Sequence, residues 1–170
     1  KLTYQKTFAT MLLTPLTHRQ ILLGEVLWAA SKGVLGVIGV MVVSSIFGLF
    51  NLKLFFILPI VFTLSLVFAA FGLIIVSIAR NYDSFIFSTS GFIIPLSLIS
   101  GTYFSLKDMP QLIQWLAYLF PLSHAVQLVR HIMQNKFEII TVGTHSLVLV
   151  VYAIGLVYLA DYLFRRKMIS

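Results

Sequence analysis

The chain has 170 residues, of which 59% are hydrophobic and 10% are charged, and its formal net charge is +7. A soluble domain carries about 25% charged residues and cannot bury this much apolar surface at this length, so the composition predicts an integral membrane protein. The basic residues are scattered singly between apolar runs, which favours a positive-inside topology over nucleic-acid binding. Cysteine is absent, which excludes disulfides and cysteine-based metal sites.

The first segment, residues 1–18, is expected to form a short amphipathic helix on the cytoplasmic side. Its apolar side chains recur at helical spacing, at Tyr4, Phe8, Met11 and Leu12. Pro15 ends the segment, and Thr17 with Gln20 has the pattern of a capping box, which predicts the start of a long helix that enters the membrane. The chain begins without methionine or a signal peptide, so we expect an N-terminal part to be missing.

Five stretches without Asp, Glu, Lys or Arg approach or exceed the length of about 20 residues that a spanning helix needs. They are Gly33–Phe50, Leu54–Ala79, Ser84–Leu106, Met109–Val129 and Ile139–Ala160. The basic residues that flank them decide which stretches cross, because lysine and arginine collect on the cytoplasmic side. These residues are Lys1, Lys6, Arg19 and Lys32 before the first run, Arg80 after the second, and Arg165, Arg166 and Lys167 after the last. All of them face the cytoplasm only if Met109–Val129 does not span.

The sequence of that stretch agrees with this exclusion. Pro121 breaks it in the middle, and it carries glutamines and a histidine that are costly in lipid. After Pro121 one helical face is apolar and the other polar: Ala125, Leu128, Val129, Ile132 and Met133 against His124, Gln127, Arg130, His131 and Gln134. We therefore expect a re-entrant helical hairpin over 101–138 on the outer side, buried against protein, with bends at Gly101, Pro110 and Pro121.

The predicted fold is an all-α membrane protein with one domain over 1–170. Four transmembrane helices are expected at 19–50, 54–79, 84–100 and 139–164, together with the cytoplasmic helix and the outer hairpin. Small residues along the first span predict close helix packing, either within the chain or with a second copy: Ala29, Gly33, Gly36, Gly39, Ser44 and Gly48.

Aromatic residues gather around the predicted hairpin, at Tyr103, Phe104, Trp115, Tyr118 and Phe120. One interpretation is an aromatic belt at the membrane interface. The sharper hypothesis is that some of them line an exit path for an amphipathic or glycan substrate.

No motif for catalysis or nucleotide binding is present in the sequence. The glycine-rich phosphate loops are missing, and His18, His124, His131 and His145 lack zinc-type spacing, so we interpret them as interfacial or capping residues and expect no metal site. The runs Leu54–Ala79 and Ser84–Leu106 have no charged residue in mid-membrane, whereas proton- or sodium-coupled carriers place ionisable groups there. This favours an energy source outside the chain.

Two segments together resemble the ABC-2 type permeases, the membrane subunits of ATP-driven exporters. The segment from Lys6 to Leu16, KTFATMLLTPL, is similar to the cytoplasmic stretch before the third span of that family. The segment from Ser100 to Pro110, SGTYFSLKDMP, followed by Trp115 and by FPLSH at 120–124, is similar to its outer re-entrant region. The resemblance covers nearly the whole chain and is strongest to the bacterial branch that includes nodulation-factor (lipo-oligosaccharide) and polysaccharide export permeases.

The resemblance implies a six-span permease of the bacterial inner membrane, of which this chain holds the third to sixth spans. Two copies would pair with two ATP-binding subunits, so that ATP and Mg are bound by the partner and this chain is not itself an enzyme. The implied coupling helix, which contacts the ATPase, includes Lys6, Thr7, Phe8, Met11, Leu12, Thr14, Pro15 and Leu16. The implied lid on the exit path includes Gly101, Tyr103, Phe104, Pro110, Trp115, Tyr118 and Pro121.

The expected function is export of a lipid-linked or amphipathic glycan, or of a hydrophobic drug. Two alternatives from other classes remain. A membrane enzyme acting on lipid-linked sugars would need interfacial carboxylates or histidines that work together, with Asp108, His124, His131 and Glu138 as the residues to mutate. A non-catalytic membrane scaffold would have no ATPase partner.

Overall fold

The computed structural model describes residues 17–49, 51–79, 81–135 and 138–169, and these residues form helices and turns without a strand. The helices are α2 (His18–Ile46), α3 (Leu54–Ile78), α4 (Tyr82–Ile99), α5 (Gln111–Tyr118), α6 (Pro121–Met133) and α7 (Ile139–Ile169), with a short 3-10 turn at Leu106–Asp108. The prediction of an all-α membrane protein is confirmed. The predicted coupling-helix residues, Lys6 to Leu16, lie outside the described residues.

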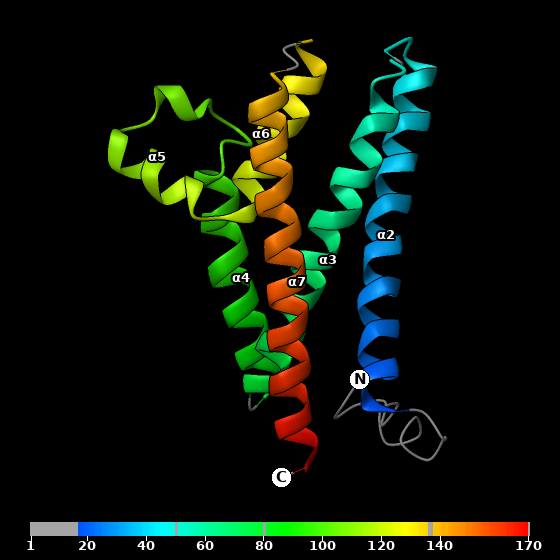
Figure 1. The fold of residues 1–170 in the computed structure, drawn as a ribbon, viewed down its shortest axis with the longest axis vertical. Coiled ribbons are helices and arrows are strands. Elements are labelled where there is room, and N and C mark those ends of the chain that lie inside the picture. The colour runs from blue at the N-terminus through cyan, green and yellow to red at the C-terminus, as the bar shows by residue number, and fades with distance from the viewer. Residues whose placement is uncertain (1–16, 50, 80, 136–137, 170) are drawn as a thin grey trace.

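The helices run back and forth along one direction (Figure 1). Helix α2 leaves the end at which it begins and at which α7 ends, α3 returns to that end, and α4 leaves it again. Helices α5 and α6 stay in the opposite half of the molecule, and α7 returns. We call the first end the terminal end and the other the hairpin end. The basic residues that flank the apolar runs predicted this return of α7 to the terminal end.

Three helical segments are long and apolar enough to cross a membrane: Arg19–Ile46, Leu54–Ile78 and Ile139–Arg166. The apolar part of α4, Asp83–Ile99, is shorter, and its 17 residues span about 25 Å at 1.5 Å per residue. Helices α5 and α6 meet at a bend of 97°, so they form the predicted break between two helices. Both lie in the hairpin half, as a re-entrant hairpin requires (Figure 1).

Helices α3 and α7 form the central pair, and two apolar clusters lie along them. The cluster nearer the terminal end joins α2 to this pair through Ile21, Leu22, Val26, Ala70, Ile74, Ala160 and Phe164. The cluster nearer the hairpin end joins α6 to the same pair through Ala125, Leu128 and Leu149. Helix α2 and the hairpin are therefore two separate attachments to one central pair.

Helix α2 begins where the Thr17–Gln20 pattern predicts, well before the charge-free run that starts at Gly33. Lys32 therefore lies in the middle of the helix. The Lys32 ammonium sits 4.9 Å from the Trp28 ring centroid, one turn closer to the terminal end. This position is consistent with a side chain that extends along the helix toward that end, as lysine does near a membrane interface.

The small residues of α2 have different surroundings. A Cβ atom on Gly33 would lie 2.1 Å from Ser65 Oγ and 3.0 Å from Ser65 Cβ on α3, so this glycine permits a close approach within the chain. A Cβ atom on Gly36 or Gly39 would meet nothing within 4 Å among the described residues. Among the glycines of α2 that the structure describes, Gly33 is the one that packs closely on another helix of the chain.

Candidate functional site

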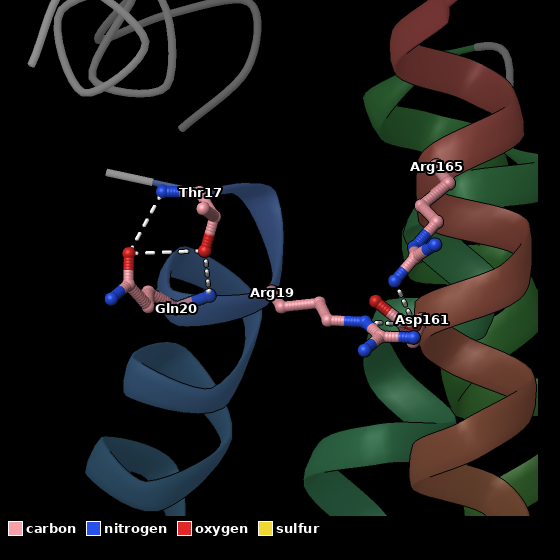
Figure 2. A network of polar contacts seen from close by, with 5 residues as sticks. All are labelled: Thr17, Arg19, Gln20, Asp161 and Arg165. Atoms are coloured by element: carbon pink, nitrogen blue, oxygen red, sulfur yellow. Dashed lines mark hydrogen bonds and ion pairs between the residues drawn. The ribbon is translucent and has the colours of Figure 1, made fainter. Parts of the chain in front are cut away.

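The terminal end of α2 begins with a complete capping box (Figure 2). The Thr17 backbone N–H donates to Gln20 Oε1 at 2.8 Å, and the Gln20 backbone N–H donates to Thr17 Oγ1 at 3.4 Å. This confirms the predicted start of the helix. Residues 6–16, for which the family resemblance implies a coupling helix, directly precede this cap in the chain.

Asp161 of α7 holds this start of α2 in place (Figure 2). Arg19 Nε donates to Asp161 Oδ2 at 3.3 Å, and Arg165 Nη2 lies 3.1 Å from the same oxygen. The Arg19 side chain is 63% exposed, so its ion pair is screened by solvent and stabilises by no more than about 1 kcal/mol. Two guanidinium groups against one carboxylate leave this cluster with a net positive charge.

At the hairpin end, Gly101 terminates α4 and starts the hairpin. Its φ of +83° is a left-handed conformation, and a Cβ atom would lie 2.8 Å from Leu106 Cγ, so only glycine fits there without strain. Arg130 of α6 donates from Nη2 to the Gly101 carbonyl oxygen. The predicted bend at Gly101 is therefore held by the second helix of the hairpin.

Each of the two predicted prolines begins a helix. Pro110 is the N-cap residue of α5 and Pro121 is the first residue of α6, where its missing N–H costs nothing. The break between the two helices exposes carbonyl groups that need donors. His124 Nε2 lies 2.9 Å from the Tyr118 carbonyl oxygen, and Tyr152 of α7 donates from its hydroxyl to the Leu119 carbonyl oxygen at 2.6 Å.

His124 also contacts His145 of α7, with 2.6 Å between the two Nδ1 atoms. The hydrogen positions follow from the network: Nε2–H of His124 donates to a carbonyl, so Nδ1 of the neutral ring accepts from Nδ1–H of His145. This pairing was missed because the two residues are far apart in sequence and only zinc-type spacing was considered. The available signal was that a histidine inside an apolar run must find a polar partner.

His124 fits the capping half of its interpretation, because it contacts the last carbonyl of α5, but it does not lie on an exposed polar face. Its side chain is buried, together with Pro121, Ser123, Ala125, Leu128 and Ile132, whereas Met133 of the predicted apolar face is exposed. The helix is amphipathic, but its buried face is rotated toward Ser123 and His124 because α7 supplies a polar partner there.

Four aromatic residues assigned to the lid lie on the outside of the hairpin: Tyr103, Phe104, Trp115 and Tyr118 are all exposed. Phe120 instead packs against Phe92 of α4, edge to face, with the ring centroids 6.0 Å apart. Below the break, a cavity of about 280 Å³ is lined by aromatic and apolar side chains, among them Phe71, Phe92, Phe120 and Tyr152. The hairpin thus closes one end of an apolar cavity, and its exposed aromatics face outward.

The residues named for a membrane enzyme do not converge on one site. Asp108 is exposed on the 3-10 turn, and Glu138, also exposed, accepts from Thr141 Oγ1 at 2.9 Å. His124 forms hydrogen bonds with the Tyr118 carbonyl oxygen and with His145. Within the described part of the chain, no group of three histidine, aspartate or glutamate residues is placed to hold a metal ion.

The helices, the re-entrant hairpin and the apolar surface define a polytopic membrane protein. The family profile of the ABC-2 type transporters matches residues 3–134. The chain belongs to this family.

Curated relatives named Nodulation protein J match nearly the whole chain. The protein of Rhizobium leguminosarum bv. trifolii is 34% identical over 166 residues, which cover 97% of this chain and 63% of the relative. The protein of Sinorhizobium fredii is 32% identical, covering 98% of this chain and 63% of the relative. The chain therefore spans less than two thirds of the length of these relatives. No solved structure matches the chain with significance.

Proposed function

We propose that the chain is the membrane-spanning permease part of an ATP-driven ABC exporter of the bacterial inner membrane. Membership of the ABC-2 type transporter family is the observation that carries this proposal. The cargo is a lipid-linked or amphipathic glycan, with a hydrophobic drug as the main variation. The relatives named Nodulation protein J support a cargo of the lipo-oligosaccharide class. The terminal end faces the cytoplasm, in agreement with its basic residues.

Two permease copies work with two ATP-binding subunits, which bind ATP and Mg and carry out hydrolysis. The coupling helix at residues 6–16 is continuous in sequence with the capped start of α2. Movement of that helix is transmitted to α2 because the capping box makes Thr17 and Gln20 part of its first turn, while the single Arg19–Asp161 ion pair is weak enough to let α2 shift against α7. A 29-residue helix then carries the movement across the bilayer.

The hairpin at the other end of α7 acts as a lid on the exit path. Its supports are the buried contacts of His124 with His145 and of Tyr152 with the break between α5 and α6. Because both contacts end on α7, a displacement of α7 changes the position of the hairpin over the apolar cavity beneath it. The exposed aromatics of α5 are available to the outer membrane surface or to the cargo.

Co-purification of the full-length protein with its candidate ATP-binding subunit tests the proposal. The variant Phe8→Asp/Leu12→Asp places charge on the predicted apolar face of the coupling helix, whereas Thr10→Asp places charge away from that face. We expect wild type and Thr10→Asp to retain the ATPase and the double variant to lose it. Failure of the wild-type protein to retain any ATPase would contradict the assignment and would move the membrane-enzyme hypothesis to the front.

A further inference from the structure

An apolar groove runs between α2 and α7 at the terminal end. Both helices pack on α3 but make few contacts with each other, and the space between them measures about 550 Å³. Leu23 and Leu27 form one wall, Ile154 and Tyr158 form the other, and Leu66 of α3 lies at the base. The four wall residues are between 47% and 74% exposed, so among the described residues nothing covers the groove.

The length of the groove matches one leaflet of a bilayer. Its lining runs from Arg19 to Leu27 on α2 and from Ala153 to Asp161 on the antiparallel α7. Eight residue steps of a helix correspond to about 12 Å, close to half of a hydrocarbon core about 30 Å thick. An acyl chain is much thinner than a helix about 10 Å across, and it fits lengthwise between the two walls.

The groove ends at the charged cluster of Arg19, Asp161 and Arg165. Figure 2 shows Arg19 reaching from α2 to Asp161 while Arg165 approaches the same carboxylate along α7. Both ion pairs use the single oxygen Oδ2, although each guanidinium carries five N–H donors. Arg165 Nε is buried and has no acceptor among the described residues. The cluster therefore combines a net positive charge with unused donors.

An apolar groove that ends in two arginines is complementary to an amphipath with an anionic headgroup. Arginine binds phosphate oxygens through parallel, charge-assisted hydrogen bonds. We propose that the groove binds one anionic phospholipid from the leaflet at the terminal end. One acyl chain lies between Leu23 and Ile154, and the phosphate is bound by Arg19 and Arg165. The lipid links α2 to α7 where the protein itself makes only exposed ion pairs, a role that goes beyond the export function.

Native mass spectrometry of the purified full-length protein tests the headgroup part of this site. The protein is incubated with phosphatidylglycerol or with phosphatidylethanolamine, and the retained lipid is counted. We expect preferential retention of phosphatidylglycerol, and a loss of about tenfold in Arg19→Gln/Arg165→Gln, because charge-assisted hydrogen bonds are removed. Arg166→Gln removes an exposed positive charge on the same helix and should retain the lipid as wild type does.

The groove itself is tested by filling it. Leu23→Trp should displace phosphatidylglycerol while leaving the charged cluster intact, and Val40→Trp, at an exposed position of α2 away from the groove, should not. If Arg19→Gln/Arg165→Gln fails to fold, Leu23→Trp still tests whether the groove binds the lipid. Because no ATPase is present, the outcome does not depend on the proposed transport function.

Three results would overturn the proposal. The first is equal retention of the two lipids, and the second is unchanged retention in Leu23→Trp. The third is a cross-link from cysteine at Leu23 to another segment of the full-length chain or to a second copy, since protein would then fill the groove.

Discussion

Helix α2 and the α5–α6 hairpin are attached to the same helix pair in different ways. Helix α2 has an apolar seam on the central pair and one ion pair to α7, Arg19–Asp161, which contributes little in water and weakens with salt. The hairpin has an apolar seam as well, and two hydrogen bonds join it to α7: the part-buried contact of His124 with His145 and the exposed bond from Tyr152 to the Leu119 carbonyl. Breaking the histidine contact leaves polar groups without their partner in a largely apolar environment. Helix α2 is thus free to shift against α7, whereas the hairpin stays fixed to it.

Removal of His124 tests the difference between the two attachments most strongly, because we expect the largest loss of stability there. His124→Leu leaves the Tyr118 carbonyl and His145 without their partner, at a cost of about 1–3 kcal/mol for each buried group left unpaired. We expect the largest fall in thermal unfolding midpoint of any variant proposed for this chain, with faster protease cleavage in the hairpin. Gln134→Leu, at the exposed C-cap position at the other end of α6, should unfold as wild type does.

The apolar attachment of α2 is tested at Gly33. Gly33→Leu forces a side chain into Ser65 of α3, and overpacking of this kind costs about 1–3 kcal/mol. The unfolding midpoint in detergent should fall. Gly36→Leu provides the matched control, because its side chain would project into open space. Equal effects of the two substitutions would mean that α2 is not seated on α3 at Gly33.

The turn that opens the hairpin is tested by Gly101→Ala. A left-handed conformation costs a residue with a Cβ atom about 1–2 kcal/mol, and here the Cβ atom also meets Leu106. The variant should unfold at a lower temperature than wild type. Gly91→Ala, within α4 and with open space around its Cβ position, should be neutral or slightly stabilising.

The smallest effect is expected at the ion pairs of α2. Asp161→Asn removes both contacts to Oδ2, yet exposed pairs contribute no more than about 1 kcal/mol. The difference from wild type should disappear at high salt, because screening weakens the wild-type pairs. A loss as large as that of His124→Leu, measured in the same detergent, would abolish the distinction between the two attachments.

Much of the architecture could be predicted from the sequence because lipid constrains it so strongly. Charge-free runs located the spans, the arginines after the last run required α7 to return, and Pro121 marked the break. The start of α2 was visible in the Thr17–Gln20 pattern. These features are local in the sequence, or depend on one rule about charge.

The contacts between helices could not be predicted in this way. The pairing of His124 with His145 and that of Arg19 with Asp161 join residues in different helices, and their sequence separation carries no signal. Similarly, small residues on α2 predicted close packing without saying that only Gly33 meets a neighbouring helix. The role of residues 6–16 in coupling and the role of the hairpin as a lid remain predictions.

The most direct test measures whether ATP moves α2 and the hairpin differently relative to α7. Spin labels at Gly24 and Arg166 report the distance between α2 and α7, and labels at Gln134 and Leu147 report that between the hairpin and α7. The full-length protein is measured in complex with its candidate ATPase, with and without ATP. We predict that ATP changes the first distance and leaves the second unchanged. If ATP changes neither distance, or if only the hairpin moves, α2 does not carry the ATP-driven movement and the proposed mechanism is wrong.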